Sequence, residues 1–294
     1  MDNGVPFADM GLTKFDDGIW LKREDEHELG AFKWRGAVAV LEAKRPDVVV
    51  TASTGNHGAA TAWAARRAGA RAVVFVPTQA SAAKVALIEA QGAELHRAGA
   101  DMDEAKAAAR AYAEEQDAFF FEDGAEPAQF DGYEQIGNEL LDELPEPPGA
   151  VVVPVGNGAL AIGVFRAVAG RAPDALRVAV AAEEAPAMWE SWRAGAPRDS
   201  DRCRTFADGL AIRVAIPLAV AELNPLVQRF ELVSEAELEQ AMRAYAESGI
   251  RVEGAAAAPL ALARREWLPR PLVLIVTGRN VDDDLYNRIL TSDP

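Results

Sequence analysis

Short runs of apolar, often β-branched residues alternate along this chain with longer alanine-rich segments whose apolar positions recur at helical spacing. The runs that predict strands are residues 48–51, 72–76, 93–96, 118–121, 150–153, 177–181, 230–233 and 272–276. The segments between them predict helices, among them residues 57–68, 81–90, 103–116, 130–143 and 235–247. Strands that alternate with helices in this way are typical of βαβ units. The pattern therefore predicts an α/β fold built on parallel sheet.

The composition predicts a soluble globular protein and argues against several classes of binding partner. The 294 residues are 50% hydrophobic, which is enough for a buried core. With 46 acidic and 30 basic residues the formal charge is -16, so we expect no binding to nucleic acid or to an anionic membrane. Cys203 is the only cysteine, as is usual in a reducing compartment. Residues 1–10 lack the pattern of a secretion signal, and we expect a cytoplasmic protein with a small-molecule substrate.

Lys33 is the first candidate for a chemically active side chain. It lies between Phe32 and Trp34 in a stretch that turns at Gly30. Large apolar neighbours solvate an ammonium poorly, so they favour the neutral amine, which is the form that attacks carbonyl groups. A solvated lysine on an amphipathic helix is the alternative interpretation, and it is the more common case for a lysine considered alone.

Three loops follow expected strands, at the edge where open parallel sheets bind their ligands. Residues 53–57 read STGNH, residues 156–159 read GNGA, and residues 277–280 read TGRN. The first two stand at the start of expected helices, so their backbone amides and the helix dipole can hold an anion such as a phosphate. A hydroxyl at a buried strand end, as in the third loop, can hydrogen-bond to a ring nitrogen. Helix capping or a tight turn explains each loop when it is taken singly.

Taken together, these segments resemble the pyridoxal-phosphate (PLP) enzymes of the tryptophan synthase β-chain fold type, also called fold type II, and within them the serine/threonine dehydratase family. The similar motifs are GAFKWRGA around Lys33, STGNH, PVGNGAL, FADGLA at 206–211, VEGAAAAPL at 252–260 and TGRN. The resemblance covers residues 18–282. It implies pyridoxal 5′-phosphate as cofactor, a homodimer, and two domains that each contain an open, mostly parallel twisted sheet flanked by helices. Residues 1–47 and 126–294 would form the large cofactor domain, and residues 48–125 the small domain.

The resemblance also implies a role for each motif in holding the cofactor. Lys33 would form the Schiff base, with Phe32 beside it in the cofactor pocket. Asn56 would hold the 3-hydroxyl oxygen of the ring, and Thr277 would face the ring nitrogen with Glu253 nearby. Four residues of the glycine-rich loop would bind the phosphate: Gly156, Asn157, Gly158 and Ala159.

The substrate and metal assignments come from the same resemblance. The pocket for the substrate carboxylate would consist of Ser53, Thr54, Gly55 and His57. Thr54 also stands where related racemases carry a serine that acts as their second acid/base. The metal site of those racemases aligns with Glu183, Ala187 and Trp189, and we expect no metal because tryptophan cannot ligate a cation.

The leading chemistry is β-elimination of a hydroxy amino acid of the L-threonine or L-serine type. Lys33, once released, would take the proton from the substrate Cα. A hydroxyl rather than a carboxylate at residue 277 would leave the ring nitrogen largely neutral, so the ring stores carbanion charge less well and loss of the β-substituent competes with reprotonation. The products would be a 2-oxo acid and ammonia, which makes the protein a lyase of amino-acid metabolism.

Other outcomes stay open. They are racemisation of serine or a related amino acid, β- or γ-replacement of the threonine synthase type, and a PLP-binding relative with reduced catalysis. The sequence departs from the dehydratase pattern at Ala31, where serine is common, and at Arg279, which could pair with an acidic substrate group or with Glu253. Residues 132–135 read GYEQ, which would place Tyr133 and Glu134 near the pocket wall. The chain ends soon after residue 280, so we expect no C-terminal regulatory domain.

Overall fold

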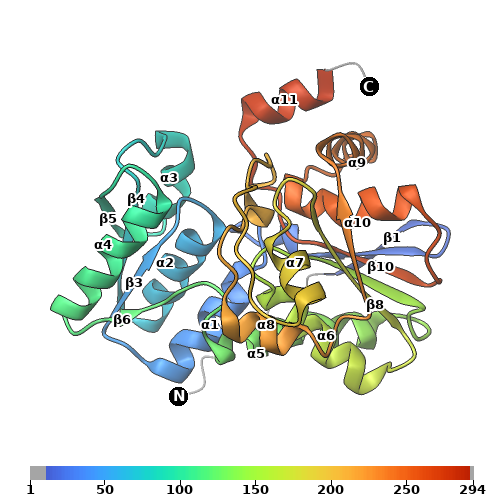
Figure 1. Ribbon diagram of the computed structural model, residues 1–294, viewed down its shortest axis with the longest axis horizontal. Helices are drawn as coiled ribbons and strands as arrows, with labels where there is room; N and C mark the ends of the chain where they lie inside the picture. The colour runs from blue at the N-terminus through green and yellow to red at the C-terminus, as the bar shows by residue number, and fades with distance from the viewer. Residues whose placement is uncertain (1–10, 292–294) are drawn as a thin grey trace.

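Two separate β-sheets organise the molecule, as Figure 1 shows. The computed structural model describes residues 11–291, apart from the side chains of residues 83 and 84, so the segment inspected for a secretion signal lies outside the described residues. The six-stranded sheet has the order β1-β2-β10-β7-β8-β9, and the four-stranded sheet has the order β5-β4-β3-β6. Every strand pair described is parallel except the β1–β2 hairpin. The predicted α/β fold with mostly parallel sheets is confirmed.

The strands of the large sheet are β1 (Leu12–Asp16), β2 (Ile19–Arg23), β7 (Ala150–Pro154), β8 (Leu176–Ala182), β9 (Arg229–Val233) and β10 (Leu272–Val276). Those of the small sheet are β3 (Val48–Ala52), β4 (Arg71–Val76), β5 (Glu94–Arg97) and β6 (Phe119–Phe120). Each predicted strand is present, with its ends within one residue of the prediction. Continuous apolar runs predict buried parallel strands such as β7 and β10, whereas the shorter β5 and β6 at the edges of the small sheet are only partly buried. The domain limits at residues 48 and 125 stay a prediction.

The helices are α1 (Lys33–Lys44), α2 (Asn56–Ala68), α3 (Ala82–Glu89), α4 (Met102–Glu115), α5 (Pro127–Glu143), α6 (Ala159–Arg171), α7 (Ala187–Ala194), α8 (Pro217–Leu223), α9 (Glu235–Glu247), α10 (Gly254–Arg265) and α11 (Asp283–Thr291). Two 3-10 turns, Glu24–Glu26 and Asp208–Leu210, complete the set. Helix α5 begins earlier than predicted because Pro127 occupies its first turn, where the missing N–H is not needed. None of the described helices has the length and apolarity that a membrane crossing requires.

Alternation along the large sheet divides its core between two faces. Val152 and Leu274 pack in the cluster formed with α9 and α10, whereas Val151, Val153 and Val273 pack in the cluster formed with α5 and α6. Side chains of a strand alternate between faces, so helices on both sides keep these strands out of water. This burial leaves the carboxyl ends of the strands and their loops as the accessible edge.

The β1–β2 hairpin was not predicted, because its strands carry polar residues at the edge of the sheet. Lys22 of β2 is fully buried, and it pairs with Glu139 at 2.8 Å and Glu143 at 3.2 Å. Arg35 of α1 is also buried and bridges Glu24 at 2.8 Å and Glu139 at 2.6 Å. Buried charges persist only when they are paired and hydrogen-bonded. This ionic cluster fixes the first turn of α1, and with it Lys33, against β2 and α5.

Candidate active site

Two segments that are far apart in the sequence lie side by side at the start of α1. The amide of Phe32 donates to the carbonyl of Thr277 at 3.0 Å, and that of Arg279 donates to the carbonyl of Gly30 at 2.9 Å. Gly30 has a φ of +66°, and a Cβ there would lie 2.5 Å from Oδ1 of Asn280, so the close approach requires glycine. The pairing brings the end of β10 against the residue that precedes Lys33.

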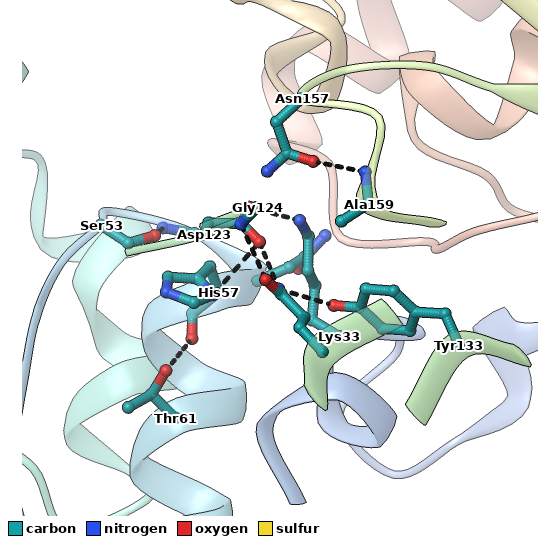
Figure 2. A network of polar contacts seen from close by, with 12 residues as sticks. Lys33, Ser53, His57, Thr61, Asp123, Gly124, Tyr133, Asn157 and Ala159 are labelled. Atoms are coloured by element: carbon teal, nitrogen blue, oxygen red, sulfur yellow. Dashed lines mark hydrogen bonds and ion pairs between the residues drawn. The ribbon is translucent and has the colours of Figure 1, made fainter. Parts of the chain in front are cut away.

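Lys33 is the first residue of α1, and its Nζ lies 2.5 Å from Oδ2 of Asp123, as Figure 2 shows. The ring of Phe32 lies 5.1 Å from the same nitrogen. Trp34 faces another direction and stacks on His27, with 4.5 Å between ring centroids. The prediction that two aromatic side chains surround the amine is therefore wrong for Trp34, because consecutive helical residues point to different sides.

Asp123 is held in a fixed position by Gln129. The Gln129 amide nitrogen donates to Oδ1 of Asp123 at 2.6 Å and to the hydroxyl of Tyr133 at 3.1 Å, and its oxygen accepts from the amide of Gly124 at 2.7 Å. Gln129 and Tyr133 are fully buried. Burial raises the pKa of Asp123, but the Lys33 ammonium and these hydrogen bonds outweigh burial and hold the pKa below its ordinary range. Beside the Lys33 ammonium, the Asp123 side chain is therefore an ionised carboxylate.

The STGNH loop leads into α2 beside this carboxylate. Nδ1 of His57 lies 3.6 Å from Oδ1 of Asp123, and burial lowers the pKa of the imidazole. Ser53 Oγ accepts from the amide of Gly55 at 3.2 Å, and Gly55 is exposed with open space where a side chain would stand. Thr54 is half-buried in the same turn. The loop thus presents backbone and hydroxyl groups at the N-terminus of a helix, which suits a carboxylate.

The glycine loop between β7 and α6 lies against the turn that carries Asp123. A Cβ on Gly124 would lie 3.1 Å from Nδ2 of Asn157, so the two loops touch. Gly158 has a φ of +98° and directly precedes Ala159, the first residue of α6. Oδ1 of Asn157 accepts from the amide of Ala159 at 3.0 Å. The loop therefore leads directly into a helix N-terminus, and the Asn157 side chain accepts a hydrogen bond from one of its amides.

Glu253 joins the remaining predicted residues into one network. Its Oε2 accepts from Nδ2 of Asn56 at 2.9 Å, and its Oε1 accepts from the hydroxyl of Thr277 at 3.4 Å. Asn280 donates to Oδ1 of Asn56 at 2.8 Å. Burial raises the pKa of Glu253 to about 7, although both hydrogen bonds act in the opposite direction. The amide and hydroxyl that were assigned to a cofactor ring are thus directed at a carboxyl group here.

These features bring a lysine amine at the start of α1, the glycine loop before α6 and the threonine hydroxyl after β10 together in an α/β protein. The family model described as pyridoxal-phosphate dependent enzyme matches residues 10–278, and the chain belongs to this family.

Individual relatives agree with that membership. The chain is 32% identical over 279 residues to an L-threonine ammonia-lyase of Thermotoga maritima, a match that covers 92% of this chain and 69% of the relative. It superposes on a threonine deaminase of T.th. with a TM-score of 0.87 and 31% identity, covering 93% of this chain and 92% of the other. Maize serine racemase gives a TM-score of 0.87 at 25% identity, covering 95% and 91%.

The residues present fit pyridoxal phosphate. A Cβ on Gly156 would lie 2.2 Å from the carbonyl oxygen of Gly209, so the backbone path of the phosphate-type loop depends on glycine. Helix α6 provides the positive end of its dipole. Lys33 provides an amine for the aldehyde, and Thr277 provides an uncharged donor for a pyridine nitrogen. The donor set thus matches an aldehyde, a ring and a phosphate.

The sequence prediction missed Asp123 and Gln129. A signal existed, because Asp123 follows the predicted strand at 118–121, where the carboxyl-end rule applies equally well. Arg279 was predicted to pair with Glu253 or with a substrate, yet its guanidinium donates to the main-chain carbonyls of Asp25 and His27. Tyr133 is fully buried against Phe32 at 5.0 Å and reaches the site through Gln129. Within residues 11–291, the structure groups no three His, Cys, Asp or Glu side chains in a way that could hold a metal.

Proposed function

We propose that this protein is a PLP-dependent ammonia-lyase that acts on L-threonine or L-serine and releases a 2-oxo acid and ammonia. The observation that carries the proposal is the position of the Lys33 amine. It contacts Asp123, and the next residue, Gly124, packs against Asn157 of the glycine loop before α6. The similarity to an L-threonine ammonia-lyase and to threonine deaminase supports the substrate class.

Each motif has one task in this proposal. Lys33 holds the cofactor covalently and, when free, takes the proton from the substrate Cα. The backbone amides of residues 156–159 bind the phosphate at the N-terminus of α6. Asn56 holds the 3-hydroxyl oxygen of the ring. When bound, the cofactor supplies an electron-withdrawing ring that acidifies the Cα–H bond.

The substrate carboxylate binds at the start of α2. The turn formed by Ser53, Thr54 and Gly55 offers a hydroxyl, an open backbone and a helix N-terminus. His57 directly follows this turn, and burial lowers its pKa, so the imidazole adds no positive charge there. A substrate held there has its Cα near Lys33, because His57 and Lys33 share Asp123 as a neighbour.

Thr277 favours elimination over other outcomes. Its hydroxyl is uncharged and can hydrogen-bond to a pyridine nitrogen without transferring a proton to it. By leaving that nitrogen largely neutral, Thr277 would favour loss of the β-hydroxyl over return of a proton to Cα. The overall reaction removes water across Cα and Cβ, and hydrolysis of the released enamine returns that water and frees ammonia.

The test is to offer the loaded enzyme a panel of serine, threonine and 3-hydroxyaspartate stereoisomers and to measure 2-oxo acid release. We expect L-threonine or L-serine to be used. Lys33→Ala should abolish release and the visible absorption of bound cofactor while the far-UV circular dichroism stays unchanged. Lys44→Ala is the control, since Lys44 is half exposed at the other end of α1 and pairs with Glu126. Turnover by Lys33→Ala would contradict the assignment.

Racemisation is the second candidate, supported by the similarity to maize serine racemase and by the hydroxyl of Thr54. A racemase places an acid/base on each face of the substrate. Thr54→Val would then abolish interconversion of L- and D-serine, whereas an elimination that needs only Lys33 would persist. Chiral analysis of serine recovered from deuterated water separates the two reactions.

The setting that fits this function is a homodimer in the cytoplasm. The cytoplasmic location is supported by the single Cys203, and the dimer rests on the analogy with the dehydratase family. Sedimentation equilibrium of the loaded enzyme tests the dimer, which would have twice the 31.4 kDa chain mass.

A further inference from the structure

Among residues 11–291, Asp123 is a charged group in direct contact with Lys33, and the family resemblance gives it no role. It lies on the loop after β6, whereas the assigned residues lie on the lysine segment, on the loops after β3, β7 and β10, and, for Glu253, directly before α10. Its Oδ2 accepts from the Lys33 amine at 2.5 Å, and its Oδ1 accepts from the Gln129 amide at 2.6 Å. A carboxylate is therefore built into the reacting end of the site.

The position of this carboxylate is fixed from behind. Gln129 is fully buried and donates to Oδ1 at 2.6 Å, while the same Gln129 is held by the Gly124 amide and the Tyr133 hydroxyl. A side chain fixed by such a network does not turn away when its environment changes. Asp123 will therefore stay where it is after the cofactor binds.

Covalent attachment of the cofactor removes the donor that Asp123 uses here. The Lys33 nitrogen then belongs to the bond with the cofactor and no longer offers a full ammonium. The other described partners of Asp123 are the Gln129 amide and the His57 imidazole, which burial keeps neutral. Oδ2 of Asp123 then lacks its described donor, so it can accept a hydrogen bond from a new donor, whereas a second carboxylate brought beside it costs free energy through like-charge repulsion.

The substrate must enter the space beside this carboxylate. A base that takes a proton from Cα approaches it to about 3–3.5 Å, so a carboxylate at 2.5 Å from Lys33 Nζ lies within about 6 Å of Cα. The β-substituent is two bonds from Cα, so it comes within reach of the carboxylate when it points toward Asp123. Arg279, which could have neutralised an acidic side chain, is engaged by the carbonyls of Asp25 and His27.

We propose that Asp123 is a specificity-determining residue, which selects amino acids whose β-substituent donates a hydrogen bond, either a hydroxyl or an ammonium, and excludes those with an acidic side chain. This inference rests on the proposed function. It places 2,3-diaminopropionate beside serine and threonine among the substrates, and it removes 3-hydroxyaspartate from them.

The experiment compares kcat/KM of the loaded enzyme for L-serine, L-2,3-diaminopropionate and 3-hydroxyaspartate in the wild type and in Asp123→Asn. We expect the serine to 3-hydroxyaspartate ratio to fall at least about tenfold in the variant, and the diaminopropionate to serine ratio to fall as well. A ratio is used because loss of the Lys33 contact slows all substrates alike. Asp131→Asn, at an exposed position of α5 paired with Arg166, should leave both ratios unchanged.

A binding series supplies a readout that does not depend on turnover. Affinities of L-alanine and L-aspartate for the loaded enzyme are measured by calorimetry in the same variants. Asp123→Asn should tighten aspartate binding about tenfold relative to alanine, and Asp123→Glu, which keeps the charge, should retain the wild-type preference. Circular dichroism verifies that each variant is folded.

The outcomes are distinguishable. Equal use of serine and 3-hydroxyaspartate by the wild type, or ratios that Asp123→Asn does not move, would overturn the role of Asp123 while leaving ammonia-lyase activity in place. Release of no 2-oxo acid from any substrate would overturn the proposed function instead. In that case the alanine and aspartate affinities still decide whether Asp123 excludes acidic ligands.

Discussion

At the scale of single residues, the charge of the site depends on two carboxyl groups with opposite behaviour. Asp123 stays ionised because Lys33 and its hydrogen bonds outweigh burial, whereas burial dominates at Glu253 and raises its pKa to about 7. The difference lies in the partners, since Asp123 faces a cation and Glu253 faces an amide and a hydroxyl. Burial therefore moves the titration of Glu253 to near neutral pH.

Glu253 should make the stability of the cofactor-free protein depend on pH. Its folded pKa of about 7 exceeds the ordinary value of 4.5, so below 4.5 both states are protonated and the contribution is complete. Between 4.5 and 7 the unfolded chain loses its proton first, and the folded state loses roughly 3 kcal/mol before the effect levels off. Urea unfolding at pH 5 and pH 8 should show this decrease in the wild type and a smaller one in Glu253→Gln.

The control for this measurement is Glu247→Gln, because Glu247 is exposed at the end of α9. It should keep the wild-type difference between pH 5 and pH 8. If Glu253→Gln also keeps it, then the carboxyl group titrates at its ordinary value and the burial argument fails.

At the scale of elements, the site depends on the loops that connect strands to helices. The glycine loop between β7 and α6 follows a fully buried strand and passes so near residue 209 that a side chain at Gly156 has no room. The lysine segment reaches its place through pairing with the loop after β10. Local sequence encodes the first of these arrangements, and long-range pairing produces the second.

Gly156→Ala should weaken cofactor binding. The new Cβ would lie 2.2 Å from the Gly209 carbonyl oxygen, so the backbone must move, and overpacking of this kind destabilises by about 1–3 kcal/mol. We expect at least about a tenfold rise in the apparent dissociation constant for pyridoxal phosphate, which corresponds to about 1.4 kcal/mol. Titration of the cofactor-free protein, followed by absorbance, measures it.

Gly170→Ala in α6 is the matched control, since nothing lies within 4 Å of a Cβ built there. Replacing glycine by alanine inside a helix stabilises by roughly 0.5–1 kcal/mol, so this variant should bind the cofactor normally and melt slightly higher. Equal cofactor affinity of Gly156→Ala and the wild type would show that the loop does not hold the phosphate.

At the scale of the whole molecule, the site connects the two sheets. Asn56 and Asp123 follow strands of the four-stranded sheet, while Thr277 and the glycine loop follow strands of the six-stranded sheet. Figure 1 shows the two sheets as separate parts of the molecule. A ligand held from both sides stabilises the folded protein because it binds the unfolded chain far less well. The cofactor should therefore contribute to the stability of the entire chain.

Removal of the cofactor should lower the melting temperature. A ligand at one hundred times its dissociation constant adds about 2.7 kcal/mol, and about 2–4 °C per kcal/mol for a chain of 150–250 residues gives roughly 5–10 °C. Calorimetry before and after treatment with hydroxylamine and dialysis measures the change. Lys33→Ala, which lacks the covalent bond, should show a smaller difference, and identical melting temperatures for loaded and stripped wild type would contradict a bridging role.

The amino-acid sequence by itself determined the parallel strands, the helices between them and the loops that hold the candidate motifs. These features are local: an apolar run of strand length, a glycine before a helix, or a lysine in a fixed segment can each be identified without knowing what lies opposite. Pro127 shows the limit of boundary prediction, since it extends α5 beyond the apolar pattern.

Only the tertiary structure decided which charged groups meet. Asp123 follows Lys33 by 90 positions, and Arg279 reaches a carbonyl 254 positions away. Trp34 turned out to pack on His27, and Lys22 entered the core with two glutamates. Ion pairs and hydrogen bonds act over a few ångströms in space and do not depend on sequence separation, so no local sequence pattern predicts them. These contacts determine which groups in the site are charged.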